Sequence, residues 1–594
     1  MIKLQTLVLF ASALVAVAQT PGTFVPTGSM AAPRIEGHRA TLLNDGRVLI
    51  TGGFPDVAGA ELYDPSSGTF TSAGTMTSPR NHHTATLLND GRVLIAGGSY
   101  GRGPSAELYD PSNGTFTPTG NMVSGGMYGQ SAVLLGNGKV LFSAGVFGVP
   151  TGAGGVRVTP APPELYDPVN GTFTSAGEGK LTILGSTATL LSDGKVLLAG
   201  GYAVGDTSIY DPATGTSKFL TNLPIWGHTA TLLKNGTVLI AAGSFLSGSD
   251  KYNDYGQESL ASARIYDPSL GRFRFTGSML EARDGHSATL LPAGLVLVAG
   301  GDWNSTDILA SAELYDPASG AFTRTGGMSV RRVSHTATLL HDGRVLITGG
   351  AGSYSPSVGL ASAELYVPPV MAVSSASLLT APFAPQSLGS LFGSGLAGTT
   401  ESFEPTSTLP ATLGGVSLRV RDSSGVERLA GLLYVSPSQI NFQVPAGTAS
   451  GDITLELLNS PAQVPPVAAQ VRPVSPAVFT FENNRAGAYA VRVEPDGAQT
   501  ILSVQNSVVL DDRPVFLVVY ATGIRNRSAY ADLQCTIGSA SVPVEYAGPE
   551  GSGWVPGLDQ VNVRLTSTLK GIGVANLMVS IDGVLSNTVS VDVR

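Results

Sequence analysis

A sequence element that recurs seven times between residues 22 and 368 restricts the possible folds of this chain more than any other feature. In its fullest form it reads H-T-A-T-L-L-x-D-G-R-V-L-I-x-G-G, and its copies are centred on Gly46, Gly91, Gly138, Gly194, Gly236, Gly294 and Gly343. A second element, A-E-L-Y-D-P, follows each copy, and a third, G-T-F or a variant, follows in six units. A period of 42 to 58 residues is typical of repeat architectures.

Each unit is predicted to contain four short β-strands. T-A-T-L-L and V-L-I-x-G-G are apolar runs, and the D-G pair between them favours a tight hairpin turn. The proline of Y-D-P ends a third strand, and the glycine of G-T-F turns the chain into a fourth. Four strands at this period predict a β-propeller blade, so we expect an all-β protein with a seven-bladed propeller over residues 19–369.

The third element is displaced in a way that predicts how the ring closes. It follows the tyrosines of six units but is missing after Tyr366, whereas an orphan copy, Gly22-Thr23-Phe24, precedes the first unit. We therefore expect residues 22–28 to supply the outer strand of the seventh blade. Closure of this kind removes open sheet edges, which otherwise favour aggregation.

These repeats resemble Kelch repeats of the galactose oxidase central-domain type. The resemblance rests on the glycine pair, on the tyrosine downstream and on the aromatic residue after it, and it covers about 345 residues in all seven units. Phe usually stands where Kelch units often carry Trp. The resemblance implies a copper centre held by two Tyr and two His, with one Tyr cross-linked to Cys. The only cysteine here is Cys535, outside the repeats, so that cross-link is not expected.

Residues 369–594 show a weaker duplication. Phe392-Gly393-Ser394-Gly395-Leu396 parallels Tyr520-Ala521-Thr522-Gly523-Ile524, and Ser438-Gln439-Ile440-Asn441-Phe442 parallels Asp559-Gln560-Val561-Asn562-Val563. Two units with short strands predict Ig-like β-sandwiches over 370–473 and 474–594. The segment, most specifically Leu433 to Pro445, resembles the C-terminal domain of exported proteins of Solibacter-type soil bacteria, a family without assigned chemistry.

The first 18 residues are predicted to be a secretory signal peptide. Lys3 precedes an apolar run from Leu7 to Val17, and Ala16-Val17-Ala18 forms a small-residue cleavage site. We therefore expect a secreted, periplasmic or cell-surface protein with no membrane span after signal removal. The net charge of −9, without a run of Lys or Arg, argues against a nucleic-acid partner.

The loops that vary between units are predicted to lie on one face of the ring. They comprise residues 145–163, 243–262, 301–311 and 350–361, and they connect the second and third strands. The turns of the other face are uniform. Because binding residues tend to occupy variable loops on a rigid scaffold, we expect the variable face to be functional.

Five histidines occupy the same position in their repeats: His38, His83, His228, His286 and His335. Arg34, Arg80, Arg283 and Arg332 precede most of them, whereas Gln130 and Ser186 replace His in the third and fourth units. A ring of His and Arg would suit an anionic or polyhydroxyl ligand or a metal. The alternative, which we favour, is that a residue repeated in register performs the same packing or hydrogen-bonding task in every blade.

Candidate ligand-binding residues combine this ring with aromatic residues near or within the long loops: Arg80, His83, Trp226, His228, Tyr255, Arg283, His286, Trp303, Arg332 and His335. Tyr252 and Tyr354 also lie in these loops and would stack on sugar rings or pack against the loop base. Asp250, Asn253, Asp254 and Glu258 resemble Ca²⁺ ligands in type, but their spacing fails the EF-hand pattern and favours a solvated acidic loop.

No catalytic residue, metal ligand or cofactor is assigned from the sequence, because no nucleophile elbow, phosphate loop or HExxH motif occurs. The leading hypothesis is an exported, non-catalytic binding protein that presents one propeller face to a glycan or an extracellular protein. One alternative is a carbohydrate-active enzyme with a galactose-oxidase-like fold but without the Tyr-Cys copper-radical site. Another is a structural or adhesive cell-surface protein.

Overall fold

The computed structural model describes residues 21–594 except 56, 99–104, 124–129, 144–145, 151–155, 161–162, 178–184, 202–204, 248–255, 305, 355–356, 381, 405–407, 482–483, 503–506, 530–531 and 552–554. The predicted signal peptide therefore lies outside the described residues. Within them there is no α-helix, and the regular structure consists almost entirely of short antiparallel strands. Nor does any described helix have the length and apolar character needed to cross a membrane.

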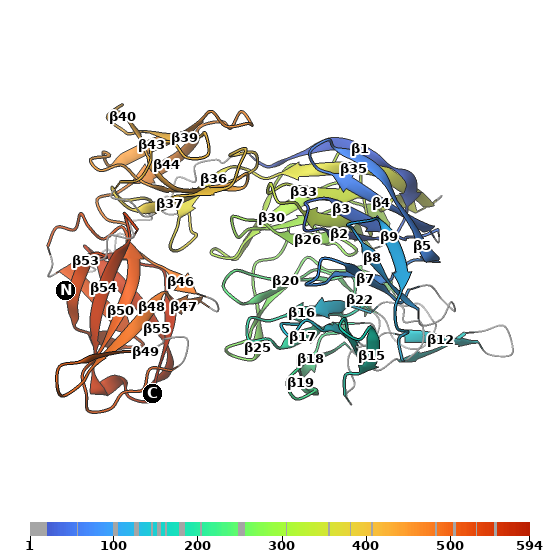
Figure 1. Cartoon of the computed structure of the whole chain (residues 1–594), viewed down its shortest axis with the longest axis horizontal. Coiled ribbons are helices and arrows are strands. Elements are labelled where there is room, and N and C mark those ends of the chain that lie inside the picture. The colour runs from blue at the N-terminus through green and yellow to red at the C-terminus, as the bar shows by residue number, and fades with distance from the viewer. Residues whose placement is uncertain are drawn as a thin grey trace, which may run out of the picture.

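Seven antiparallel sheets, numbered 1 to 7 along the chain, form one part of the molecule (Figure 1). Six of them have four strands, and sheet 7 has a fifth short strand beside its main four. Sheet 1 contains β2 (Arg39–Leu42), β3 (Val48–Thr51), β4 (Val57–Asp64) and β5 (Thr69–Arg80), and sheet 2 contains β6 (Thr84–Leu87), β7 (Val93–Ala96), β8 (Ala106–Asp110) and β9 (Thr115–Pro118). Sheet 3 contains β10 (Ala132–Leu134), β11 (Val140–Phe142), β14 (Glu164–Asp167) and β15 (Thr172–Ser175). Sheet 4 contains β16 (Thr187–Leu190), β17 (Val196–Ala199), β18 (Asp206–Asp211) and β19 (Thr216–Asn222).

The remaining three sheets follow the same order. Sheet 5 contains β20 (Thr229–Leu232), β21 (Val238–Ala241), β24 (Ala263–Asp267) and β25 (Arg272–Phe275), and sheet 6 contains β26 (Ser287–Leu290), β27 (Val296–Ala299), β30 (Ala312–Asp316) and β31 (Ala321–Arg324). Sheet 7 contains β32 (Thr336–Leu339), β33 (Val345–Thr348), β35 (Ser357–Val367) and the N-terminal β1 (Thr23–Arg34).

The first strands of the seven sheets contact one another in a closed cycle. The cycle runs β2, β6, β10, β16, β20, β26, β32 and back to β2, so the sheets stand around a common axis in a propeller-like ring. The second strands are buried on both faces, as the 0% exposure of Val48, Leu49 and Ile50 illustrates. These strands are apolar along their whole length because each packs against a neighbouring sheet on either side.

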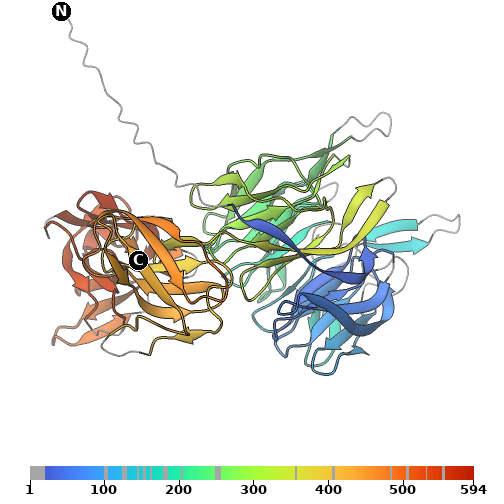
Figure 2. The same ribbon diagram turned by 90° about the horizontal axis from the view of Figure 1, so that it is seen from above.

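The N-terminal strand β1 occupies the place that the orphan Gly22-Thr23-Phe24 predicts. It runs antiparallel to β35, with Thr23 opposite Val367 and Phe24 opposite Tyr366. The Phe24 and Tyr366 rings lie 4.9 Å apart, as the equivalent Tyr and Phe do within other sheets. Figures 1 and 2 show this N-terminal strand in blue beside the yellow strand that ends the repeats. The first and last repeats of the chain therefore share one sheet.

The first C-terminal unit consists of two sheets around a core that includes Phe442 and Leu418. One sheet contains β36 (Met371–Ser374), β37 (Leu388–Phe392), β38 (Glu401–Ser402), β41 (Gly431–Val435) and β42 (Gln439–Gln443); the other contains β39 (Ser417–Arg421), β40 (Glu427–Leu429), β43 (Gly451–Leu458) and β44 (Val467–Val471).

The second C-terminal unit repeats this two-sheet plan around a core that includes Cys535. One sheet contains β45 (Ala477–Val478), β48 (Ala488–Val493), β49 (Gln499–Leu502), β50 (Val515–Thr522), β53 (Val544–Pro549) and β54 (Asp559–Leu565); the other contains β46 (Thr480–Phe481), β47 (Arg485–Ala486), β51 (Leu533–Ile537), β52 (Ala540–Val542), β55 (Gly573–Ile581), β56 (Val584–Leu585) and β57 (Val589–Val593).

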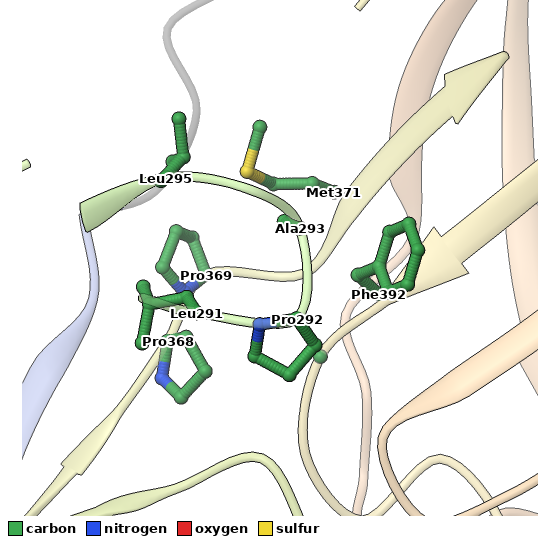
Figure 3. Close-up of a pocket in the computed structure, with 9 residues that line it drawn as sticks. Leu291, Pro292, Ala293, Leu295, Pro368, Pro369, Met371 and Phe392 are labelled. Atoms are coloured by element: carbon green, nitrogen blue, oxygen red, sulfur yellow. The ribbon is translucent and has the colours of Figure 1, made fainter. Parts of the chain in front are cut away.

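One part of the junction between the ring and the first C-terminal unit is apolar and tightly packed, and a cleft of about 1120 Å³ lies beside it, lined by Arg47 and Arg344 of the ring and by Ser394 and Pro461 of that unit. Figure 3 shows the turn at Leu291 and Pro292 beside Pro369, Met371 and Phe392. The cavity among these side chains has a volume of only about 10 Å³. The Lys234 ammonium also lies 5.0 Å from the centre of the Phe392 ring. Separation of the two parts at this point would expose these apolar side chains to water.

We expect deletion of residues 19–30 to destabilise the ring, because it removes most of β1 and exposes the edge of β35. The midpoint of thermal unfolding, measured by calorimetry, should fall by about 10 °C or more, with aggregation on heating. Substitution of the exposed Val25 by Thr in the same strand is the control and should change the midpoint little. Unchanged thermal stability of the deletion variant would contradict the closure mechanism.

Candidate functional site

The variable loops form small hairpins on the ring. β12 (Val146–Pro150) pairs with β13 (Val156–Pro160), β22 (Ser244–Ser247) with β23 (Gly256–Ser259), β28 (Asp302–Trp303) with β29 (Asp307–Ile308), and β34 (Ala351–Tyr354) with the start of β35. In Figure 1 the β12 hairpin extends beyond the ring. These hairpins connect the second and third strands of sheets 3, 5, 6 and 7.

The five repeated histidines lie inside the seams between sheets, where each bonds to the preceding sheet. Their exposure does not exceed 8%. His83 Nε2 lies 2.8 Å from Thr51 Oγ1, and His228 Nε2 lies 3.1 Å from Thr187 Oγ1. His286 and His335 make the same contact, with the hydroxyls of Thr229 (3.0 Å) and Ser287 (2.9 Å). His38 Nε2 instead bonds to the carbonyl oxygen of Thr348 at 3.0 Å and lies 3.4 Å from Thr336 Oγ1.

The paired glycines of the repeat leave room for these histidines. A Cβ on Gly200 of sheet 4 would lie 2.3 Å from His228 Cε1 of sheet 5, and a Cβ on Gly243 would lie 2.9 Å from His228 Cβ. The first glycine of a pair therefore receives the histidine of the next sheet, and the second packs against the histidine of its own sheet. The histidine and the glycine pair therefore recur together in the repeat, because they pack against each other in the seam between two sheets.

The repeated arginines are buried in ion pairs with the glutamate of A-E-L-Y. Arg80 Nε donates to Glu107 Oε1 at 3.0 Å, and its Nη1 donates to the carbonyl of Gly97 at 2.9 Å. The other Glu107 oxygen accepts the backbone N–H of Thr77. Arg34 with Glu61, Arg283 with Glu313 and Arg332 with Glu364 repeat this pairing. Buried ion pairs of this kind need several hydrogen bonds to offset their desolvation.

The arrangement matches the alternative in which the repeated residues perform one structural task. Even Gln130, which replaces His in sheet 3, reaches the preceding sheet and donates to the carbonyl of Ala96 at 3.3 Å. Arg80, His83, His228, Arg283, His286, Arg332 and His335 are all buried and hydrogen-bonded within the protein. Ligand binding by these seven side chains stays a prediction.

A different group of polar side chains meets at the rim of the ring, on the side of the variable loops. Asp284 and Asp302 of sheet 6 exchange two backbone hydrogen bonds, both of 3.0 Å. Residues opposite each other in such a pair place their side chains on the same face. The Asp284 and Asp302 carboxylates are therefore neighbours, and their residues are only 8% and 1% exposed.

The adjacent sheets supply a hydroxyl to each carboxylate. The Ser244 hydroxyl of sheet 5 donates to Asp284, and the Tyr354 hydroxyl of sheet 7 donates to Asp302 at 2.5 Å. Burial, the hydrogen bond to Asp302 and the charges of Asp302, Asp284 and Glu36 raise the pKa of the Tyr354 hydroxyl far above its ordinary value. The phenol therefore stays protonated and acts as a donor. This rim cluster, Ser244, Asp284, Asp302 and Tyr354, joins three sheets.

Two aromatic side chains of the rim face solvent. Trp303 follows Asp302 directly and is 53% exposed, and Tyr354 is 42% exposed. Asn304 and Ser259 exchange hydrogen bonds of 2.7 and 2.8 Å, which tie the loop of sheet 6 to that of sheet 5. Trp226 is half-buried, in a backbone bridge with Ser244. The predicted Tyr255, with Tyr252, Asp250, Asn253 and Asp254, lies outside the described residues.

The described side chains do not fit a copper centre. No three His, Cys, Asp or Glu side chains in that part of the chain converge where they could hold a metal. The histidines lie in separate seams, each with Nε2 engaged by its neighbour. Cys535 is buried in the second C-terminal unit, where burial raises the pKa of its thiol to about 12. No Tyr-Cys cross-link can therefore form within the ring.

No protein-family model matches this chain, and no curated protein matches it either. Among solved structures, the chain is similar to one described as a novel fungal alcohol oxidase with catalytic diversity among the AA5 family, in complex with copper. The two share 19% identity over 76% of this chain and 99% of that chain, with a TM-score of 0.48. A similarity at this level says nothing of the activity of this chain.

The sequence interpretation missed Ser244, Asp284 and Asp302. Asp284 directly follows the repeated arginine of its sheet, and Ser244 and Asp302 directly follow glycine pairs or their variants. The equivalent positions of sheet 7 carry Val333 and Ala351. An alignment of the repeats on their glycine pairs would therefore have shown the two aspartates as residues in which sheet 6 differs from the neighbouring sheets.

We expect Gly200→Ala to destabilise the ring strongly. The new Cβ would meet His228 at 2.3 Å, in addition to the strain of an alanine at φ of +71°. The free energy of unfolding, measured in urea, should fall by about 3 kcal/mol or more. Gly194→Ala is the control, because its φ is also positive (+82°) but its Cβ meets nothing within 4 Å, and it should cost about 1 kcal/mol. Equal losses would contradict the seam contact.

Burial of the histidines predicts a loss of stability in acid. Burial lowers the pKa of His38 and His335 to about 3 and of His228 to about 4, and the pKa values of His83 and His286 also lie well below the ordinary value. The unfolded chain therefore binds protons below about pH 6.5 that the folded ring excludes. The free energy of unfolding should fall as the pH decreases from 6.5, by up to about 1.4 kcal/mol per pH unit for each histidine.

Urea unfolding at pH 7.5 and 5.5 measures this dependence. His228→Gln introduces the residue that sheet 3 carries at the equivalent position. It should reduce the pH dependence of the free energy of unfolding by the contribution of one histidine. His341→Gln is the control, because His341 is exposed and should leave the slope unchanged. A free energy of unfolding that is constant between these pH values would contradict the assignment.

Proposed function

We propose that this protein is an exported carbohydrate-recognition protein built on a seven-bladed Kelch-type β-propeller. The rim of sheets 5 to 7 binds the glycan. The two C-terminal units, which we assign as Ig-like sandwiches, hold the ring away from the surface to which the protein is attached. The rim carries the proposal, because an exposed tryptophan stands directly beside buried carboxylates there.

The chemistry of the rim suits a sugar. The faces of Trp303 and Tyr354 offer apolar surface to the C–H face of a pyranose ring. The buried carboxylates of Asp284 and Asp302 accept hydrogen bonds from the Ser244 and Tyr354 hydroxyls, and this fixes the Tyr354 ring in place beside the exposed surface. A few placed polar groups beside an apolar surface are the usual composition of a small-ligand site.

A second candidate function is a carbohydrate-active enzyme, which the neighbouring carboxylates of Asp284 and Asp302 favour. Glycoside hydrolysis uses two carboxyl groups, one as the acid and the other as base or nucleophile. Incubation of the protein with the glycans that bind it separates the two functions. New reducing ends, or stoichiometric bound metal in the purified protein, would favour the enzyme over the binding protein.

We expect Trp303→Ala to weaken glycan binding by about tenfold or more, because it removes the exposed stacking surface. A glycan array with the full chain identifies the ligand, and calorimetric titration measures its affinity. Phe275→Ala is the matched control, because Phe275 is 70% exposed on the outer strand of sheet 5, away from the rim. No binding on the array, or equal affinity of the tryptophan variant, would contradict the proposal.

A further inference from the structure

Most seams of the ring are closed by a dipeptide that lies within the outer strand of one sheet, or directly after it, and contacts the next sheet. Between sheets 2 and 3, Thr119 Oγ1 lies 2.9 Å from the Tyr166 hydroxyl and 3.4 Å from the carbonyl oxygen of Gly171. The backbone N–H of Gly120 donates to the same carbonyl at 2.9 Å. We call this Thr-Gly dipeptide the latch.

The same latch recurs around the ring. Thr27-Gly28, Thr276-Gly277 and Thr325-Gly326 contact the tyrosines and glycines of sheets 1, 6 and 7 in this way. Ala73-Gly74 and Ala176-Gly177 hold the equivalent positions before sheets 2 and 4. The latch glycine allows a close approach, since a Cβ on Gly120 would lie only 2.2 Å from the carbonyl oxygen of Gly171.

Sheet 4 has no latch. Leu220 and Thr221 stand where the other outer strands have Thr or Ala followed by Gly. The pairing of β18 with β19 shifts here, from Thr207 opposite Thr221 to Ser208 opposite Phe219, so that Leu220 forms a bulge. The outer strand therefore remains paired with its own sheet as far as Asn222. Thr221 carries a Cβ and cannot make the approach that a latch glycine makes.

A cleft of about 410 Å³ lies at this seam, between sheets 4 and 5. Its lining includes the apolar Leu220, Ile209 and Leu270. Charged residues of both signs also line it, namely Lys195, Lys218, Asp193 and Asp211. Tyr266 and Gly271, the equivalents of Tyr166 and Gly171, also line it. The cleft thus contains the two groups that a latch contacts elsewhere. Its volume falls within the range of ligand-binding pockets.

The Tyr266 hydroxyl has no hydrogen-bond partner among the described residues, although its residue is only 2% exposed. Its ring packs on Phe273 at 5.0 Å, which fixes the direction of the hydroxyl. Burial and the nearby charge of Asp193 raise the pKa of this phenol, so it remains protonated and can donate. Because Tyr266 lines the cleft, its hydroxyl is open to water there, and a ligand hydroxyl in the cleft would take the place of that water.

We propose that the cleft between sheets 4 and 5 binds an extended peptide segment of a partner protein that carries a Thr-Gly or Ser-Gly dipeptide. The peptide hydroxyl accepts from Tyr266 and donates to the carbonyl of Gly271, and the following glycine N–H donates to the same carbonyl. These are the contacts that the latch makes at the closed seams, where the occupant is itself an extended peptide. The site is separate from the rim, and the proposal does not depend on the glycan.

A fluorescein-labelled peptide with the sequence of residues 115–121, T-F-T-P-T-G-N, tests the proposal with the full chain. Fluorescence polarisation should show saturable binding. Val-Ala in place of the Thr-Gly of the peptide should weaken it tenfold or more. Tyr266→Phe should do the same, because it removes only the hydroxyl and keeps the ring against Phe273. Tyr315→Phe is the matched control, since Thr276 already occupies that hydroxyl, and should leave peptide binding unchanged.

A second variant tests the cleft without removing any of its polar groups. Leu220→Thr combined with Thr221→Gly restores a latch sequence in sheet 4, so it should abolish peptide binding and raise the midpoint of thermal unfolding. Absence of saturable binding to the unmodified protein, or equal binding by Tyr266→Phe, would overturn the proposal. A third result would also overturn it: the protein binds cellopentaose but not the peptide, and Tyr266→Phe weakens the binding of cellopentaose. The occupant of the cleft would then be a glycan.

Discussion

The close approach of each sheet to the next is the constraint on which the rest of this structure depends. The second strands, such as β3, are apolar on both faces, so only a neighbouring sheet on either side removes them from water. The seam contacts set that approach. His228 fits against Gly200 of the preceding sheet, and a single added methyl group at Gly200 would prevent the fit. Closure by β1 then completes the cycle.

This constraint explains why the most regular residues of the repeat are poor guides to its function. The repeated histidines and arginines are occupied in the seams, with pKa values and ion pairs that follow from burial. Where a repeat departs from the others, polar side chains instead lie beside an exposed aromatic residue or a cleft. Sheet 6 carries Asp284 and Asp302 at the rim, and sheet 4 carries Leu220-Thr221 in place of a latch.

The fold was largely accessible to sequence reasoning, because it depends on local patterns. The D-G turns and the short apolar runs predict small antiparallel sheets, and the orphan Gly22-Thr23-Phe24 predicts the strand that pairs with β35. Sequence reasoning also stated the structural alternative for the histidines, which matches their burial. It did not find the rim cluster, because Ser244, Asp284, Asp302 and Tyr354 come together only when three sheets stand side by side.

The sequence by itself therefore determined the strands, their turns and the way in which the ends of the repeat region meet, since these follow from periodicity and from the residues that turns require. The tertiary structure alone decided which polar side chains are available to a ligand. In a sequence, a histidine that recurs at one repeat position and an aspartate that occurs in a single repeat are equally good candidates for a site. Only the distance between neighbouring sheets shows that His228 is enclosed in a seam whereas Tyr266 faces a cleft.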